Sequence, residues 1–209
     1  MAEIDREGLS DEALTRMAVL GDLRSFDVLV KRYRAAVYRV AQIYGTPEAA
    51  EDVVQDAFLA AFKALPGLDD HSRFAAWLYA ITRHESMRVS RRNSEERKRR
   101  VDLDELILTQ SEFLALPPAV EFDAVAAWVR AGIDSLQEDF RLVLKLRYYD
   151  ELPLKRISDF LALPLSTVKW RLHEARRHLK AALAPAPEMK PGLLSFEVKG
   201  NEKWNATKS

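Results

Sequence analysis

The stretch "LPLSTVKWRLHEARRHLK", Leu163 to Lys180, has a regular apolar period that predicts one amphipathic helix. At about 100° per residue, four apolar side chains fall on a single narrow stripe: Val168, Leu172, Ala175 and Leu179. The opposite face carries polar side chains with an indole among them: Ser166, Trp170, His173 and Arg177. The stretch therefore predicts a helix with one buried side and one wet, basic side.

A shorter helical pattern precedes this stretch and makes it part of a helix-turn-helix. Pro153 opens "LKRISDFLAL", and Pro164 with Leu165 separates this segment from the basic helix. Two short helices joined by about three residues, the second of them basic, are typical of this DNA-binding motif. The exposed cations Lys169, Arg171, Arg176 and Arg177 would then reach phosphates, while Ser166 and Thr167 lie at the helix N-terminus, which suits an anion.

Trp170 admits two interpretations at this stage. In the major groove it would offer an apolar contact, for instance to a thymine methyl group, with His173 bonding a base edge. Alternatively, its indole forms a helix–helix contact inside the protein.

Composition narrows the class of protein. The chain has 209 residues, of which 48% are hydrophobic and 31% charged, with 7 glycines, no cysteine and a net charge of zero. We expect a soluble, helix-rich protein of one or two domains, without disulfides, thiolate zinc sites or thiol nucleophiles. The start lacks the basic and apolar regions of a signal peptide, and no apolar run is long enough to span a membrane, so a cytoplasmic location is expected.

The whole pattern predicts an all-α fold with two small helical domains joined by a flexible linker. A first domain, residues 1–92, holds a short helix after Ser10, a long one over 23–44, one starting at Thr46-Pro47-Glu48 and one from Arg73. A linker follows over 93–122, with a transient helix possible near 103–108. The helix-turn-helix domain covers 123–184, where Ser135 to Glu138 reads as a capping box. The tail, 185–209, suits either a flexible end or a short hairpin.

Two segments of the first half, taken together with the second half, resemble a known family. "AEDVVQDAFLAAFKAL" is followed by "RFAAWLYAITRHESMRVSRR", and the second half reads "LQEDFRLVLKLRYYDELPLKRISDFLALPLSTVKWRLHEARRHLK". Over residues 23–92 and 123–183, in order and spacing, the chain resembles the group IV (extracytoplasmic-function, ECF) sigma factors of bacterial transcription. The resemblance implies a promoter-melting domain followed by a helix-turn-helix domain.

The resemblance gives a role to the acidic residues within 51–56. Four residues match the family's patch that docks on the clamp helices of RNA polymerase: Glu51, Asp52, Gln55 and Asp56. Carboxylates suit a basic protein partner and repel DNA; without the resemblance they would read as a solvated helix face. Metal chelation is disfavoured because helical spacing directs Asp52 away from Glu51.

The resemblance also implies a site that captures unstacked bases of the −10 element. It comprises the loop 68–73 and the next helix, with Leu68, Asp69, Ser72, Arg73, Arg83, His84, Arg88, Arg91 and Arg92. Leu68 replaces a frequent aromatic residue, and His84 replaces the usual asparagine. These departures bear on which base is read. The alternative for His84 is a partly exposed structural histidine, and for the arginines an ordinary surface.

For the −35 element, the resemblance implies reading by Ser166, Thr167, Lys169, Trp170 and His173, with a backbone contact from Arg147. Ser166 replaces a commoner glycine, Trp170 a commoner small residue, and Pro153 a usual serine or threonine. These departures predict an unusual −35 sequence.

The predicted function is a transcription initiation factor that binds core RNA polymerase, at its clamp and flap, and directs it to two-part promoters. We expect no enzymatic activity, metal or cofactor, because the sequence shows no catalytic constellation. Promoter DNA and an anti-sigma factor are the other expected partners, with no membrane insertion and a monomeric free state. The alternatives are a stand-alone helix-turn-helix regulator with an N-terminal effector or dimerisation domain, and a protein that only sequesters partners.

Overall fold

The computed structural model describes residues 5–101 and 121–184, and all the regular structure within these ranges is helical. This confirms the predicted all-α class. The predictions of a transient helix near 103–108 and of a hairpin in the tail lie outside the described residues. None of the described helices is both long and apolar enough to cross a membrane.

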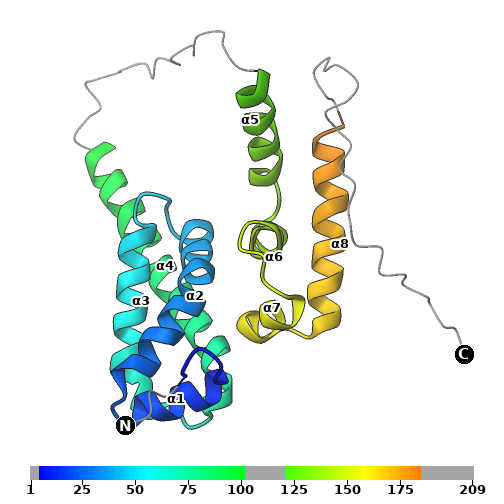
Figure 1. Cartoon of the computed structure of the whole chain (residues 1–209). Helices are drawn as coiled ribbons and strands as arrows, with labels where there is room; N and C mark the ends of the chain where they lie inside the picture. Colours follow the sequence, from blue (N-terminus) through cyan, green and yellow to red (C-terminus); the bar gives the residue numbers. More distant parts are fainter. Residues whose placement is uncertain (1–4, 102–120, 185–209) are drawn as a thin grey trace, which may run out of the picture.

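The first half packs four α-helices around one core (Figure 1). These are α1 (Asp11–Val19), α2 (Leu23–Tyr44), α3 (Ala50–Ala64) and α4 (Phe74–Val101), with short 3-10 turns η1 (Leu65–Gly67) and η2 (His71–Arg73) before α4. Ser10 caps α1 as predicted, since its Oγ accepts a hydrogen bond from the Ala13 backbone N–H at 3.2 Å.

Two helix boundaries differ from those predicted. The third helix begins at Ala50 rather than Pro47, because Thr46 to Ala49 form a turn in which the Ala49 N–H bonds back to Thr46. Helix α4 continues to Val101, beyond the predicted boundary at Arg92. The charged run after Arg92 extends a helix here because successive charged residues such as glutamate and arginine are good helix formers.

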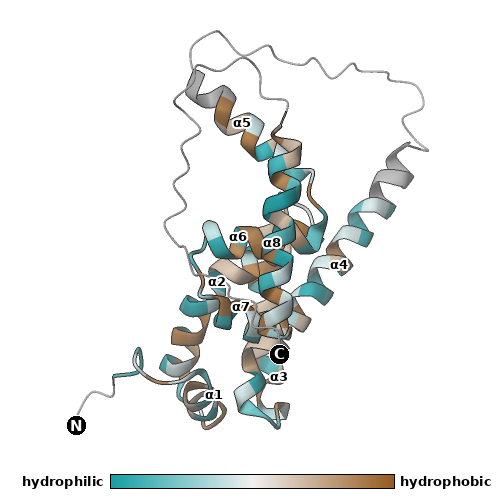
Figure 2. Cartoon of the chain, turned by 90° about the vertical axis from the view of Figure 1, so that its right-hand side faces the viewer, coloured by the Kyte–Doolittle hydropathy of each residue, from teal (hydrophilic) through white to brown (hydrophobic). Residues whose placement is uncertain are grey.

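The second half contains α5 (Glu121–Asp134), α6 (Glu138–Tyr148), α7 (Leu154–Leu161) and α8 (Leu165–Ala182). The α7–α8 pair is the predicted helix-turn-helix, and the chain turns through Ala162 in the left-handed conformation, φ 54°. The predicted capping box is wrong: the Ser135 hydroxyl donates to the Gly132 carbonyl at 2.8 Å, and Gln137 is the residue preceding α6. In Figure 2, α8 crosses the front of the molecule and presents mostly hydrophilic to neutral residues.

The two halves pack directly on each other, with α7 against α4 and α6 against α2. The buried Phe160 of α7 stacks on Tyr33 of α2, with ring centroids 5.7 Å apart, and meets Tyr79 of α4 edge-on at 5.5 Å. One core cluster therefore includes side chains from both halves. The sequence analysis separated two domains without predicting this interface.

A polar contact flanks the aromatic centre of the interface. Arg39 of α2 donates through Nε to both oxygens of Asp150, at 3.0 and 3.2 Å, and Tyr44 donates to Asp139 at 3.0 Å. The Asp150 side chain is only 6% exposed. Burial raises the pKa of Asp150, and the hydrogen bond from Arg39 partly opposes that rise.

Candidate nucleic-acid interface

One exposed face of α3 gathers the predicted docking residues. Asp52, Gln55 and Asp56 follow helical spacings of three and four and are all exposed, with Glu51 beside them. Glu51 pairs with Arg34 at 2.8 Å, which leaves both side chains more than half exposed. We call Glu51, Asp52, Gln55 and Asp56 the acidic face of α3.

Apolar side chains extend this face by one helical turn. Leu59 is 52% exposed, although the sequence analysis gave it no role. The apolar spacing of the helix after Pro47 predicts that Phe62 points inward, but its side chain is 40% exposed and meets Phe26 edge-on with ring centroids 5.1 Å apart. The spacing of Leu59, three and seven residues after Asp56 and Asp52, was the signal that could have revealed it. The exposed surface of α3 is thus partly acidic and partly apolar.

An ion pair links the acidic face of α3 to the basic face of α4. Arg88 Nη2 lies 3.4 Å from Asp56 Oδ2 and 2.5 Å from Glu85 Oε2. Two residues that the sequence analysis assigned to different partners, polymerase and DNA, therefore lie against each other.

The loop before α4 is organised by Asp70, which the sequence analysis did not single out. Its Oδ1 accepts hydrogen bonds from the Ser72 hydroxyl at 2.6 Å and the Ser72 N–H at 3.1 Å, and these bonds lower the pKa of Asp70. An aspartate two residues before a serine is the sequence signal for such a local cap. Leu68 is half-buried against the core, whereas Asp69, Ser72 and Arg73 are exposed.

The predicted −10 residues on α4 form an exposed basic strip: Arg83, His84, Arg88, Arg91 and Arg92. The His84 side chain is 77% exposed and its Nδ1 lies 3.4 Å from Glu85 Oε1. Arg83 lies over the ring of Tyr44, with its guanidinium carbon 5.2 Å from the ring centroid. His84 is thus a surface residue and not part of the core.

Helix α8 has the predicted two-sided character. Val168, Leu172 and Ala175 are buried and Leu179 is half-buried. On the other side, Thr167 is half-buried and the remaining polar residues are exposed: Ser166, Lys169, His173, Arg176 and Arg177.

Trp170 combines features of both interpretations. It is 56% exposed, so it is not a core residue, yet its ring meets Phe140 of α6 edge-on with centroids 5.9 Å apart. The other side of Phe140 stacks on His178 at 5.6 Å. Phe140 therefore supports an indole whose larger part faces solvent.

Several of the predicted DNA-contacting arginines make contacts within the protein. Arg171 Nη2 lies 2.7 Å from Asp139 Oδ2, and the Arg171 side chain is only 22% exposed. Arg147 donates to the Leu152 carbonyl at 3.1 Å, which holds the loop that leads to α7. Arg177 pairs with Glu174 at 2.6 Å on the surface of α8.

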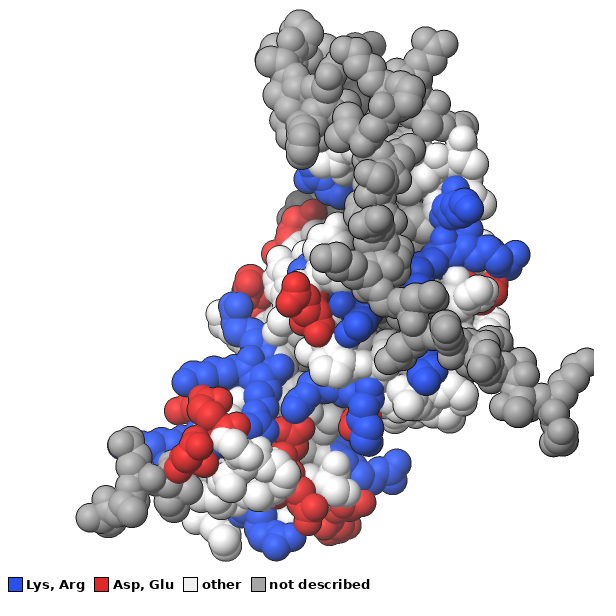
Figure 3. All heavy atoms as spheres, turned by 45° about the vertical axis from the view of Figure 1, so that its right-hand side comes forward, with Lys and Arg blue, Asp and Glu red and all other residues white. Residues whose placement is uncertain are grey.

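On the face drawn in Figure 3, the charges do not form one continuous basic field. Figure 3 shows Lys and Arg side chains interleaved with Asp and Glu over the face that it presents. In the part of the chain that the structure describes, no group of His, Asp and Glu side chains is arranged to hold a metal ion.

Comparison with known proteins identifies both halves. The family model described as Sigma-70 region 2 matches residues 29–96, and Sigma-70, region 4 matches residues 132–181, together more than half of the chain. The chain is 29% identical to the ECF RNA polymerase sigma factor SigW of Bacillus subtilis over 78% of its length and 91% of that protein. The chain belongs to the group IV sigma factors. This sigma factor is also 28% identical to the RNA polymerase sigma-H factor of Pseudomonas aeruginosa, covering 84% of the chain and 94% of the relative.

A solved structure supports the fold of this sigma factor. The structure of CnrH in complex with the cytosolic domain of CnrY matches 85% of the chain and 99% of CnrH, with 26% identity and a TM-score of 0.55. The matched regions assign α3 and α4 to region 2, and α7 and α8 to region 4. As a sigma factor, the protein is a transcription initiation factor. Helix α1 lies outside both family matches.

Proposed function

We propose that this sigma factor docks on core RNA polymerase through the acidic face of α3 and reads a two-part promoter through α4 and α8. The observation that carries this proposal is that the exposed acidic face and the exposed recognition helix fall within the region 2 and region 4 matches respectively.

In the docking step, the acidic face of α3 binds the clamp helices of polymerase, and Leu59 adds apolar contact beside the carboxylates. A central apolar group surrounded by polar groups is a common arrangement of protein interfaces. The helix-turn-helix domain binds near the polymerase flap, which positions it over the −35 element.

In promoter reading, the exposed strip of α4 and the loop 68–73 hold the non-template strand of the −10 element. His84 contacts a base, because a base extruded from the stack is bound through contacts to its edge. The arginines of the strip contact the DNA phosphates, because the negatively charged backbone binds cations: Arg88, Arg91 and Arg92. Leu68 supports the loop from the core side.

On α8, base edges of the −35 element meet Trp170 and His173, while Ser166, Thr167 and Lys169 contact the DNA near the helix N-terminus. Arg176 and Arg177 contact phosphates further along. Arg147 and Arg171 act indirectly by fixing the loop before α7 and the α6–α8 contact.

The chain itself performs no covalent chemistry in this proposal, and it acts where RNA polymerase works, in the cytoplasm. CnrH was solved in complex with another protein, the cytosolic domain of CnrY, and this similarity supports a protein partner here, which we propose is an anti-sigma factor. A stand-alone regulator would account for α7 and α8 but leaves the region 2 match without a role.

The test is the double charge reversal Asp52→Lys with Asp56→Lys. Both side chains are exposed, so the change in unfolding free energy is expected to be small, within about 0.5 kcal/mol for each site. Binding to core polymerase, measured by titration of labelled protein, is expected to weaken at least about tenfold, because attraction at a charged interface becomes repulsion.

The matched control is Asp27→Lys, which reverses an exposed charge on α2. It is expected to bind polymerase like the wild type. Equal binding by the double variant and the control would refute the docking assignment.

A further inference from the structure

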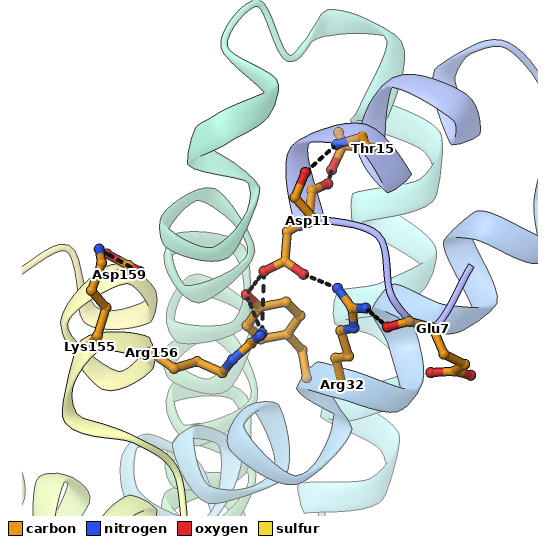
Figure 4. Close-up of polar contacts among 10 residues, drawn as sticks. Glu7, Asp11, Thr15, Arg32, Lys155, Arg156 and Asp159 are labelled. Atoms are coloured by element: carbon orange, nitrogen blue, oxygen red, sulfur yellow. Dashed lines mark hydrogen bonds and ion pairs between the residues drawn. The ribbon is translucent and has the colours of Figure 1, made fainter. Parts of the chain in front are cut away.

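The carboxylate of Asp11, on α1, contacts both halves of the molecule. Its Oδ1 accepts from Arg32 Nη1 of the first half at 2.7 Å. Its Oδ2 accepts from the hydroxyl of Tyr33 and from Arg156 Nη1 of α7, the latter at 3.3 Å (Figure 4). A helix outside both family matches thus supplies a carboxylate that joins the DNA-binding domain to the first domain.

Tyr33 belongs to both the polar and the aromatic part of this contact. Arg156 donates to its hydroxyl at 3.3 Å and lies over its ring, 5.7 Å from the centroid, while the same ring stacks on Phe160. Burial and the bond to Asp11 raise the pKa of Tyr33, so its hydroxyl stays protonated and keeps donating. We call Asp11, Tyr33 and Arg156 the latch.

The charge balance of the latch depends on both halves. Asp11 and Arg32 are about one-fifth exposed, and Arg156 about one-third. Within the described contacts, Asp11 faces two guanidiniums, and Arg32 is held in addition by the Glu7 carbonyl at 2.6 Å. When the halves separate, Arg156 regains water, while Asp11 keeps Arg32 and the Tyr33 hydroxyl, so the latch favours the closed arrangement by a modest amount.

The closed arrangement is too compact for a two-part promoter. The −10 and −35 elements lie about 25 base pairs apart by their numbering, which corresponds to about 85 Å of B-form DNA at 3.4 Å per base pair. In the structure α7 packs directly on α4. Helix α8 has 18 residues, which makes it about 27 Å long. The strip on α4 and the reading face of α8 therefore cannot contact both elements at once.

We propose that the latch holds the free sigma factor in a closed state, and that the two halves must separate before the protein can engage polymerase and promoter together. This proposal rests on the proposed function. The open fraction sets the apparent affinity for polymerase, since only that fraction is competent to bind with both halves. Weakening the latch should raise the open fraction and the apparent affinity by the same factor.

The chain offers a closely matched pair of variants on α7. Arg156→Met removes the charge that faces Asp11, and Lys155→Met removes a neighbouring charge of the same sign. Lys155 is 80% exposed and pairs only within its own helix, with Asp159 at 3.1 Å, among its described contacts (Figure 4). Asp11→Asn tests the latch from the other half.

The distance between the halves can be measured directly in the full-length protein. Because the chain has no cysteine, Ala35→Cys on α2 and Lys180→Cys on α8 introduce the only thiols for spin labels. Electron–electron double resonance should give a short, narrow distance for the wild type and for Lys155→Met. Arg156→Met and Asp11→Asn should increase the long-distance population about two- to tenfold, and the two changes together should be less than additive.

Titration with core polymerase is the second measurement. Arg156→Met should bind at a protein concentration lower than Lys155→Met by the same factor as the rise in open fraction. Equal distance distributions for these two variants would overturn the latch, and opening without a gain in affinity would overturn its role in restraining the protein. If the wild type failed to bind polymerase, the proposed function would fall, while the distance measurement would still decide whether the latch exists.

Discussion

At the scale of single residues, Trp170 and Arg171 show how neighbours on one helix take different tasks. Both belong to the basic face predicted from the sequence. Trp170 keeps most of its surface in solvent, whereas Arg171 turns toward α6 and pairs with Asp139, which also accepts from Tyr44. Exposure therefore separates a candidate for base reading from a residue that holds helices together.

We expect Trp170→Ala to relax selectivity at one or two positions of the −35 element, because a base-edge contact contributes about 1 to 3 kcal/mol of discrimination. The loss of the edge contact with Phe140 should cost about 1 kcal/mol of stability. Binding to a panel of −35 duplexes measures the first effect. Arg176→Ala is the control, expected to weaken all duplexes about equally. Unfolding of the helix-turn-helix domain without a change in selectivity would contradict the assignment.

Arg171→Ala should behave in the opposite way. Removing it leaves Asp139 with one fewer partner at the edge of the interface between the halves, so unfolding should become easier by about 1 kcal/mol. The −35 preference should stay unchanged. Denaturant unfolding measures the stability, and the same duplex panel measures the −35 preference. Lys169→Ala, which changes an exposed cation of α8, is the comparison for stability. A change in base preference without a loss of stability would show that Arg171 contacts DNA.

At the scale of elements, α4 carries a core face and an exposed basic face on one long helix. Its buried polar residues Thr82 and Ser86 bond to carbonyls one turn back, so their hydroxyls are satisfied within the helix. The exposed His84 and Arg83 follow immediately on the other side. Because Asp70 bonds Ser72 within the loop 68–73, this loop has a defined shape where it leads into α4.

We expect His84→Asn to change the preferred base in the −10 element while leaving the −35 preference unchanged. The reason is that imidazole and amide groups present different donors and acceptors to a base edge. Selection from a promoter library randomised at both elements measures the two preferences together. Identical −10 motifs for both proteins would refute the role of His84.

Helix positions were predictable wherever the signal is local. The stripe of Val168, Leu172 and Ala175 follows from periodicity alone, and Ser10 follows from capping chemistry. The capping box failed because the Ser135 hydroxyl bonds back to Gly132 instead of forward to α6, a choice that local sequence does not distinguish. Leu59 was missed because hydrophobicity alone suggests a buried side chain, although its spacing from Asp52 and Asp56 places it on the exposed face of α3.

At the scale of the whole molecule, the contact between the halves is the feature that sequence patterns could not supply. Arg39 and Asp150 are 111 residues apart, and Arg156 and Tyr33 are 123 apart. Periodicity favours an inward Tyr33 on the helix over 23–44, but it carries no information on which buried faces meet, and the contact of Tyr33 with Phe160 comes from the structure. The docking and DNA-reading residues came from resemblance, and the structure adds which of them are exposed.

We expect the wild type to unfold in a single calorimetric transition, because one core cluster includes residues of both halves. Phe160→Ala should lower stability by about 3 to 5 kcal/mol and split the transition in two, since it removes the ring shared with Tyr33 and Tyr79. Leu136→Ala, in a buried cluster made only of second-half residues, should lower the transition temperature without splitting it. Two transitions in the wild type would show that the halves fold independently.

In the proposed function, the ion pair between Asp56 and Arg88 links polymerase binding and DNA binding thermodynamically. When a basic group of polymerase pairs with Asp56, the Asp56–Arg88 ion pair breaks and Arg88 can pair with a phosphate. When a phosphate pairs with Arg88, Asp56 can likewise pair with polymerase. Such linkage is reciprocal, so each partner tightens the other by the same factor. Both side chains are more than half exposed, which keeps that factor small, within about fivefold. The sigma factor would thus favour DNA slightly more once it is part of the holoenzyme, through one surface contact between α3 and α4.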